Sequence, residues 1–164
     1  MATSRRNVLL RGWKLGGGLL AAAAAWTAYE SLRPFARAAE GGKLTLGAPQ
    51  RFGPGTATYF HAARLYATNA EGHYFALSQK CPHLGCRVPF CDSSGRFECP
   101  CHGSVFDVAG EYIKGPAPRG MDRYELTLDG DQLVVDTGAL IRGPDRDEQR
   151  LLTPPRGPSC VEGA

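Results

Sequence analysis

Hydrophobic and polar positions divide the chain into one long apolar run and a series of short alternating segments. Residues 15–29 form a run of fifteen residues without a charge, most of them alanine, glycine or leucine. From residue 43 onward, short runs with alternating hydrophobic side chains are separated by turn residues, a pattern typical of antiparallel strands. We therefore predict a mainly β protein. One N-terminal hydrophobic helix, a signal or transmembrane segment, precedes a small antiparallel β domain.

The expected strands are short, and turn sequences separate them. Residues 69–72 and 129–131 combine Asn, Asp or Glu with Gly, a composition that favours hairpin turns. We predict four regions: a signal or anchor at 1–30, a flexible linker at 31–42, the β domain at 43–137, and an extended, charged and proline-rich tail at 138–164. The strand candidates are residues 58–67, 73–77, 96–99, 104–108, 123–128 and 132–136.

The N-terminal segment has the features of an export signal. Residues 4–10, Ser-Arg-Arg-Asn-Val-Leu-Leu, resemble a twin-arginine signal, which directs export of proteins that are already folded. Residues 36–38, Ala-Arg-Ala, form a candidate cleavage site, whereas Trp13 and Trp26 bracket the apolar run like interfacial aromatics. We expect the segment to be retained as a single-pass anchor in the cytoplasmic (inner) membrane. The β domain would then lie on the outer, periplasmic face.

Charge and composition exclude several classes of protein. The net charge of +3 comes from four basic residues and no acidic residue within positions 1–14, so the rest of the chain carries 15 basic and 16 acidic residues. No basic patch for nucleic acid is therefore expected. A composition of 43% hydrophobic and 21% charged residues excludes disordered and fibrous proteins.

Two short motifs carry the candidate chemistry. Cys81 and His83 follow the pattern Cys-x-His, and after fifteen residues Cys99 and His102 follow the pattern Cys-x-x-His. Thiolates and imidazoles bind soft and borderline metals, so these four side chains suit either a tetrahedral zinc ion or a two-iron, two-sulfur cluster. Common zinc spacings place two cysteines in one motif and two histidines in the other. Here each motif supplies one of each, which favours a cluster held from two loops.

At these residues the chain resembles the Rieske iron–sulfur proteins. It is most similar to the Rieske subunits of cytochrome bc/b6f-type, quinol-oxidising complexes, because each motif holds a further cysteine, Cys86 or Cys101, and residues 115–118 read Gly-Pro-Ala-Pro. The resemblance covers residues 66–136. It implies a Rieske-type β domain with a cluster-binding subdomain, a Cys86–Cys101 disulfide between the cluster loops, and a proline loop over the cluster.

The resemblance also implies a role for each site residue. One [2Fe-2S] cluster would be bound by Cys81 and Cys99 on its inner iron and by His83 and His102 on its outer iron. His102, with His83 beside it, would accept a hydrogen bond and then a proton from quinol while the iron accepts the electron. The other residues implied around the cluster are Ser104, Phe106, Leu84, Gly85, Gly103 and Pro116.

Two residues of this set are expected to tune the reduction potential. Ser104 matches a serine that donates a hydrogen bond to a bridging sulfide in the family, and such a bond stabilises the more negative, reduced cluster. At position 106 many respiratory members carry a tyrosine, whose hydroxyl donates to a cysteine sulfur, whereas this chain has Phe106. We therefore expect a comparatively low potential, suited to menaquinol.

The expected function is electron transfer within a larger complex, without stand-alone catalysis. The partners implied are quinol, a cytochrome b-type subunit, and a cytochrome c-type subunit or soluble carrier as acceptor. Three alternatives remain at this point: the small Rieske subunit of an exported molybdenum oxidase such as arsenite oxidase, a soluble ferredoxin that supplies an oxygenase, and a structural zinc protein. Cys91 and Cys160 are left over and form a possible second disulfide in an oxidising compartment.

Overall fold

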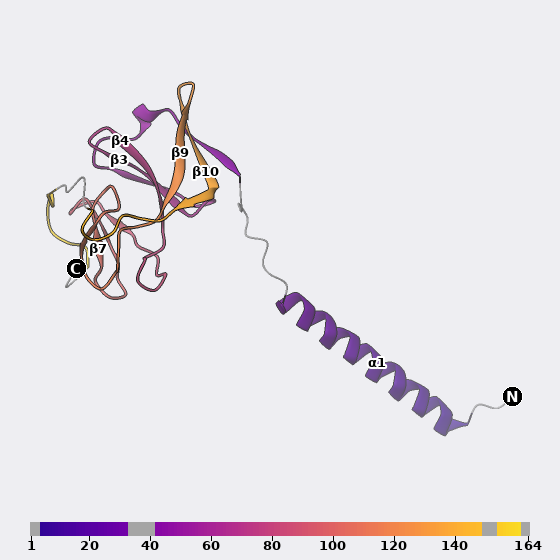
Figure 1. Ribbon diagram of the computed structural model, residues 1–164. Coiled ribbons are helices and arrows are strands. Elements are labelled where there is room, and N and C mark those ends of the chain that lie inside the picture. Colours follow the sequence, from indigo (N-terminus) through magenta and orange to yellow (C-terminus); the bar gives the residue numbers. More distant parts are fainter. Residues whose placement is uncertain (1–3, 33–41, 149–153, 162–164) are drawn as a thin grey trace. The chain divides into compact units, whose positions relative to one another are not determined.

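A computed structural model describes residues 4–32, 42–148 and 154–161 of the chain. The chain separates into two compact units, Met1–Arg37 and Ala38–Ala164. The first unit contains α1 (Arg5–Leu32), a helix of 28 residues in which no residue is buried (Figure 1). α1 therefore includes residues 31 and 32, the first two positions of the expected linker. The remainder of the linker at 33–41, with the candidate cleavage site at 36–38, lies outside the described residues.

The expected transmembrane helix is not confirmed. Within the described residues, no helix combines the length and the apolar character needed to span a bilayer. The charge-free run at residues 15–29 is fifteen residues long and consists mostly of alanine and glycine, whereas a spanning helix needs about 20 predominantly apolar residues.

The second unit contains a six-stranded antiparallel sheet in the order β1-β10-β9-β4-β3-β2. Its core includes Leu46, Leu65, Ala76 and Val135, side chains from strands far apart in the sequence. The strands are β1 (Lys43–Gly47), β2 (Ala57–Phe60), β3 (Leu65–Ala70), β4 (His73–Ser78), β9 (Arg123–Asp129) and β10 (Gln132–Ile141).

Each strand candidate overlaps an observed strand, whereas β1, β5 and β8 lie outside the candidates. Two candidates differ most from the structure. The candidate at residues 58–67 is divided between β2 and β3 by a turn in which Arg64 has a φ of 53°. β10 continues to Ile141, past the expected boundary at 137, because its pairing with β9 resumes after a register shift between Asp136 and Leu140. The predicted hairpin at 69–72 is confirmed, with Glu71 and Gly72 both at positive φ.

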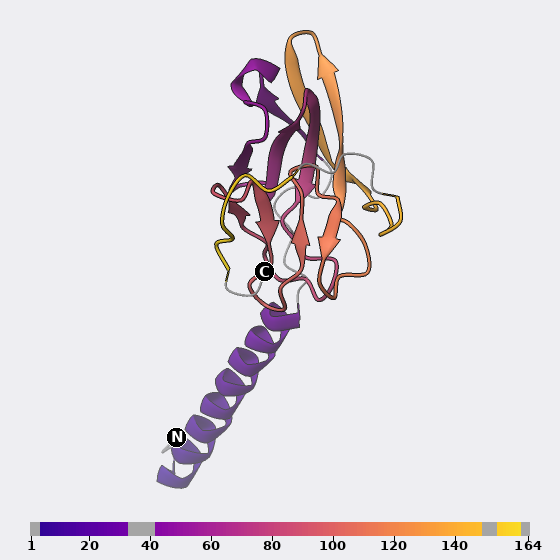
Figure 2. The same cartoon turned by 90° about the vertical axis from the view of Figure 1, so that its left-hand side faces the viewer.

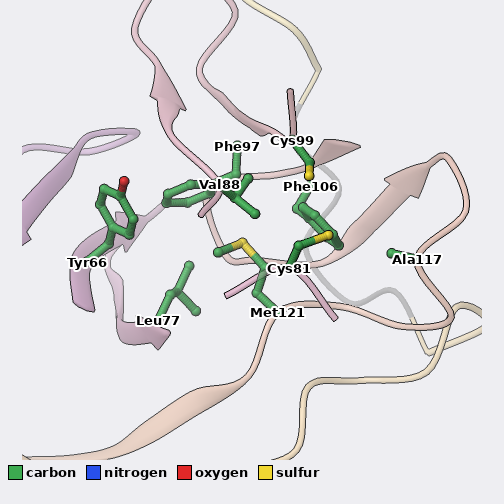
Figure 3. Close-up of a cluster of buried hydrophobic side chains, with 9 residues drawn as sticks. All are labelled: Tyr66, Leu77, Cys81, Val88, Phe97, Cys99, Phe106, Ala117 and Met121. Carbon is green, nitrogen blue, oxygen red and sulfur yellow. The ribbon is translucent and has the colours of Figure 1, made fainter. Parts of the chain in front are cut away.

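A second, smaller sheet carries the two cysteine–histidine motifs. Its order is β5-β6-β7-β8, formed by β5 (Phe90–Cys91), β6 (Arg96–Glu98), β7 (Val105–Phe106) and β8 (Tyr112–Lys114) (Figure 2). A hydrophobic cluster packs this sheet against the six-stranded one (Figure 3). Its buried members are Tyr66, Leu77, Cys81, Val88, Phe97, Cys99, Phe106, Ala117 and Met121.

The described parts of the tail after β10, residues 142–148 and 154–161, pack on the second unit. Pro144 accepts a backbone hydrogen bond from Gly120 at 2.8 Å, and further along Arg156 donates one to Ser94 at 3.1 Å. A disulfide between Cys91 and Cys160 fixes the end of this segment to β5. The possible second disulfide is therefore present, and it joins residues 69 positions apart.

Candidate metal centre

Two loops with the same backbone construction form the candidate site. They are the first loop, residues 81–86, and the second loop, residues 99–104. In each, the N–H of the opening cysteine, Cys81 or Cys99, donates to the carbonyl five residues later, at 2.7 and 2.8 Å. A glycine four residues after each cysteine, with φ of 80° or 70°, donates back to the cysteine carbonyl at 2.9 and 3.1 Å. These bonds close both loops around their cysteines.

The four candidate ligands are arranged by depth. Cys81 and Cys99 are 3% and 1% exposed, and both are free thiols. His83 is half-buried and His102 is exposed, with their ring centroids 4.9 Å apart. The site therefore presents two sulfur donors on its inner side and two neighbouring imidazoles on its outer side.

A disulfide between Cys86 and Cys101 joins the two loops, as the resemblance implies. The sulfur of Cys99 lies within 4.8 Å of both sulfurs of this bond. Cysteine side chains thus have two separate uses at the site. One pair links the loops and the other pair is free to bind metal.

The surroundings of Cys81 favour the protonated thiol over the thiolate. Burial raises the pKa of the Cys81 thiol, and the neighbouring Cys99 thiol also acts to raise it. The backbone of His83 and the side chain of Ser104 act in the opposite direction and lower the pKa of this thiol. Without metal this sulfur therefore holds its proton, and metal binding must displace that proton.

The donor set fits a two-iron cluster. Two buried thiols would supply the anionic ligands for one iron. Two adjacent imidazoles would supply neutral ligands for a second iron nearer the surface. Mixed Cys/His ligation with one residue type per iron is characteristic of the Rieske centre.

A loop that contains two prolines packs against the second cluster loop. This loop, residues 115–118, will be called the proline loop. Ala117 is fully buried and its N–H donates to the Ser104 hydroxyl at 3.1 Å. Gly115 has a φ of 99°, and a Cβ there would lie 2.5 Å from the Ser104 Cα and 2.7 Å from the Gly103 carbonyl oxygen. The approach is therefore too close for any residue other than glycine.

The remaining predicted residues lie at the site or beside it. Leu84, between the two ends of the first loop, is 71% exposed, and Gly85 and Pro116 are also exposed. Phe106 is fully buried in the same hydrophobic cluster as Cys81 and Cys99 (Figure 3). Its ring supplies no hydrogen-bond donor to either sulfur.

Sequence reasoning missed a buried carboxylate directly before the second loop. Glu98 is 2% exposed, and its carboxylate accepts four hydrogen bonds. Two come from the hydroxyl groups of Ser94 and Ser159, both at 2.7 Å. The other two come from the backbone N–H groups of Cys160 and Val161, at 2.8 and 3.1 Å. Burial acts to raise the pKa of Glu98, but these hydrogen bonds outweigh it and the pKa is lowered. The ionised side chain therefore binds the tail next to the Cys91–Cys160 disulfide. An acidic residue in a strand gave no sequence signal for this contact.

Sequence reasoning also missed a buried acidic pair after β7. Asp107 and Glu111 are 0% and 2% exposed. One carboxylate oxygen of Asp107 accepts from the N–H groups of Ala109 and Glu111, at 2.9 and 2.8 Å. The Arg123 guanidinium lies 3.6 Å from the Glu111 carboxylate. The hydrogen bonds of this group are local, but its burial and its contact with Arg123 on β9 depend on long-range packing.

The known proteins similar to this chain are iron–sulfur proteins. A family model described as the Rieske [2Fe-2S] domain matches residues 48–125. The cytochrome b6-f complex iron-sulfur subunit of Chlorobaculum thiosulfatiphilum is 30% identical over 128 residues, which cover 74% of this chain and 71% of that protein. The subunit of the same name from Synechococcus sp. (strain JA-3-3Ab) is 44% identical over 71 residues, covering 43% of this chain and 40% of that protein.

Two solved structures are similar to this chain. A chain of a hyperthermophilic respiratory Complex III is 29% identical with a TM-score of 0.48, covering 73% of this chain and 98% of that chain. The plasma membrane Rieske protein of the cyanobacterium Synechocystis PCC 6803 is 27% identical with a TM-score of 0.45, covering 56% and 97%. The chain spans about 40% of the length of the Synechococcus relative.

Proposed function

Because the chain belongs to the Rieske [2Fe-2S] protein family, we propose that it is the electron-transfer subunit of a cytochrome bc- or b6f-type quinol-oxidising complex. The observation that carries this proposal is the pair of linked loops, with buried thiols inside and imidazoles outside. The 30% identity to a cytochrome b6-f iron-sulfur subunit, over 71% of that protein, supports the same class of complex.

We assign Cys81 and Cys99 to the inner iron and His83 and His102 to the outer iron. When bound, the [2Fe-2S] cluster supplies one-electron redox chemistry. The protein's part is to hold the two thiolates away from water and to leave an imidazole accessible, as the burial of these four residues supports.

We infer that the exposed His102 imidazole is the main contact for quinol. One ring nitrogen would bind metal, and the other would accept a hydrogen bond from the quinol hydroxyl and then its proton. His83, whose ring lies 4.9 Å away, would be the second such acceptor. The exposed Leu84 would pack against the apolar quinol pocket of a cytochrome b-type partner.

The quinol type and the electron acceptor follow from the same proposal. Phe106 provides no hydroxyl donor to the cysteine sulfurs, which destabilises the reduced cluster and favours a low-potential quinol such as menaquinol. The acceptor would be a cytochrome c-type haem or a soluble carrier. We also infer that residues 4–10 direct export through the twin-arginine pathway, so that the β domain works on the outer face of the cytoplasmic membrane, within the complex.

The test is a redox titration of native membranes by electron paramagnetic resonance, with and without an inhibitor of the quinol-oxidation site. We expect the rhombic signal of a mixed-ligand [2Fe-2S] cluster, and we expect the inhibitor to shift this signal or its midpoint potential. A signal that does not respond to the inhibitor would contradict the quinol assignment. In that case the subunit of a molybdenum oxidase would be the better assignment.

A further inference from the structure

One arginine of the tail binds the outer side of the proline loop. The Nε of Arg146 donates to the Ala117 carbonyl at 2.8 Å, and its Nη2 donates to the same oxygen. Nη2 also donates to the Gly115 carbonyl at 3.2 Å. A single guanidinium therefore binds two carbonyl groups of the proline loop, a geometry that suits the planar arrangement of its donors.

Neighbouring groups hold Arg146 in this position. Its guanidinium carbon lies 4.5 Å from the ring centroid of Tyr112, and the Tyr112 hydroxyl donates to the Gly115 carbonyl at 2.6 Å. The backbone before Arg146 is fixed by a hydrogen bond from Gly120 to Pro144 at 2.8 Å. The arginine therefore approaches the loop from an ordered segment and stacks on an aromatic ring.

The inner side of the same loop faces the cluster loop. The Ala117 N–H donates to the Ser104 hydroxyl oxygen at 3.1 Å, so this oxygen acts as an acceptor toward the proline loop. The hydroxyl hydrogen of Ser104 is then directed away from Ala117. Ala117 is thus held on one side by Arg146 and on the other by Ser104.

We propose that Arg146 is a positioning residue for the redox centre. It fixes the proline loop against the second cluster loop, and through Ala117 it keeps the Ser104 hydroxyl directed at the sulfur side of the site. This inference rests on the proposed ligation of the cluster by Cys81 and Cys99, and it is independent of the quinol assignment. Arg146 lies beyond residues 48–125, the part that the family model matches.

The experiment compares three variants of the full-length, cluster-loaded chain with the wild type. R146A removes the guanidinium, and R146K keeps the positive charge but offers a single ammonium in place of the planar fork. R156A is the matched control, because Arg156 is also a tail arginine and its guanidinium donates to the Gly55 carbonyl at 2.6 Å. Among the described residues it makes no hydrogen bond to the proline loop. The readouts are hydrogen–deuterium exchange of the Ala117 amide and the midpoint potential of the cluster.

We expect the Ala117 amide to exchange about tenfold faster in R146A, the effect of losing about 1.4 kcal/mol of hydrogen bonding. We also expect a lower midpoint potential in R146A, because a misdirected Ser104 hydroxyl stabilises the reduced cluster less. R146K should also show faster exchange and a lower potential, and R156A should match the wild type in both. Exchange in β3 and β4, far from the loop in sequence, serves as the check that each variant is folded.

Specific results would overturn the inference. Unchanged exchange of Ala117 in R146A would show that the arginine does not fix the loop. Faster exchange of the Ala117 amide with an unchanged midpoint potential would show that the position of the proline loop does not affect the cluster. A wild-type potential in R146K would assign the effect to charge and not to position. Loss of the inhibitor response described above would overturn the quinol assignment and leave these measurements unaffected.

Discussion

At the residue scale, Phe106 is the residue that we expect to affect the redox potential most directly. It is fully buried beside both free thiols in one hydrophobic cluster. We expect F106Y to raise the midpoint potential by roughly 40 mV, which corresponds to one hydrogen bond of about 1 kcal/mol in a one-electron couple. F106L, which removes the ring and adds no donor, is the control and should not raise the potential. Equal potentials in F106Y and the wild type would refute the role assigned to this position.

A second prediction at the residue scale concerns Asp107. Burial raises the pKa of Asp107 to about 7, and the charge of the Glu111 carboxylate also raises it. Hydrogen bonds from the N–H groups of Glu111 and Ala109 and the positive charge of Arg123 act to lower it. Between the ordinary pKa of 3.8 and this raised value, the folded chain holds a proton that the unfolded chain has lost. The free energy of unfolding therefore falls as pH rises through this range.

The measurement is denaturant unfolding of the wild type and D107N across pH 4 to 8. We expect the wild type to lose stability on the order of 2–4 kcal/mol, relative to D107N, as pH rises from about 4 to 7, with no further relative change above that. D107N is a close structural substitute because its amide oxygen can accept the same two backbone hydrogen bonds. Parallel pH profiles for the two proteins would contradict the prediction.

At the element scale, the contact between the proline loop and the second cluster loop depends on Gly115. G115A would combine positive φ with a Cβ placed 2.5 Å from the Ser104 Cα. Gly72 is a matched control, because its φ is 90° but a Cβ there would meet nothing within 4 Å. We expect G72A to cost about 1–2 kcal/mol of unfolding free energy, and G115A about 1–3 kcal/mol more. Urea unfolding measures both, and equal costs would show that the close approach is not limiting.

The Cys91–Cys160 disulfide is a second connection between elements that can be tested. It joins β5 to the tail and closes a loop with a sequence separation of 69. Loss of this constraint in C91S/C160S should lower the free energy of unfolding by about 4 kcal/mol, because the unfolded chain gains conformational entropy. S159A removes one hydrogen bond to Glu98 and leaves the disulfide in place, so it should cost about 1 kcal/mol. A double variant as stable as the wild type would contradict this estimate.

Elements formed by local contacts were predicted from the sequence, and contacts between distant segments were not. Alternation and turn residues predicted the hairpin at 69–72 and the paired strands at 123–136, because these contacts are local. The spacing of Cys81, His83, Cys99 and His102 predicted a set of metal ligands, and the structure places these residues on two linked loops. Glu98 and Arg146 were not predicted, because each contact joins the tail to a part of the β domain that is distant in the sequence. Asp107 was not predicted because its burial depends on the fold, although its hydrogen-bond partners are close in the chain.

At the scale of the whole molecule, the N-terminal unit should determine where the β domain works. In R5K/R6K the paired arginines of the proposed export signal become lysines, and we expect the protein to remain in the cytoplasm. R11K is the matched control, since Arg11 lies in the same helix outside residues 4–10 and its replacement should not affect export. Cell fractionation followed by detection of the β domain measures the result. Export of R5K/R6K at the wild-type level would contradict the proposed pathway.

The nearness of three cysteine sulfurs has a consequence for the order of assembly. Cys99 lies within 4.8 Å of Cys86 and Cys101, so premature oxidation could pair a ligand thiol with the wrong partner. On the proposed export route, the cluster would be inserted in the reducing cytoplasm, where all six cysteines are thiols. The two disulfides would then close after export. At that stage Cys81 and Cys99 would already be bound to metal and protected from oxidation. The order of these two events, as well as the geometry of the site, would then decide which of the six cysteines bind metal and which form disulfides.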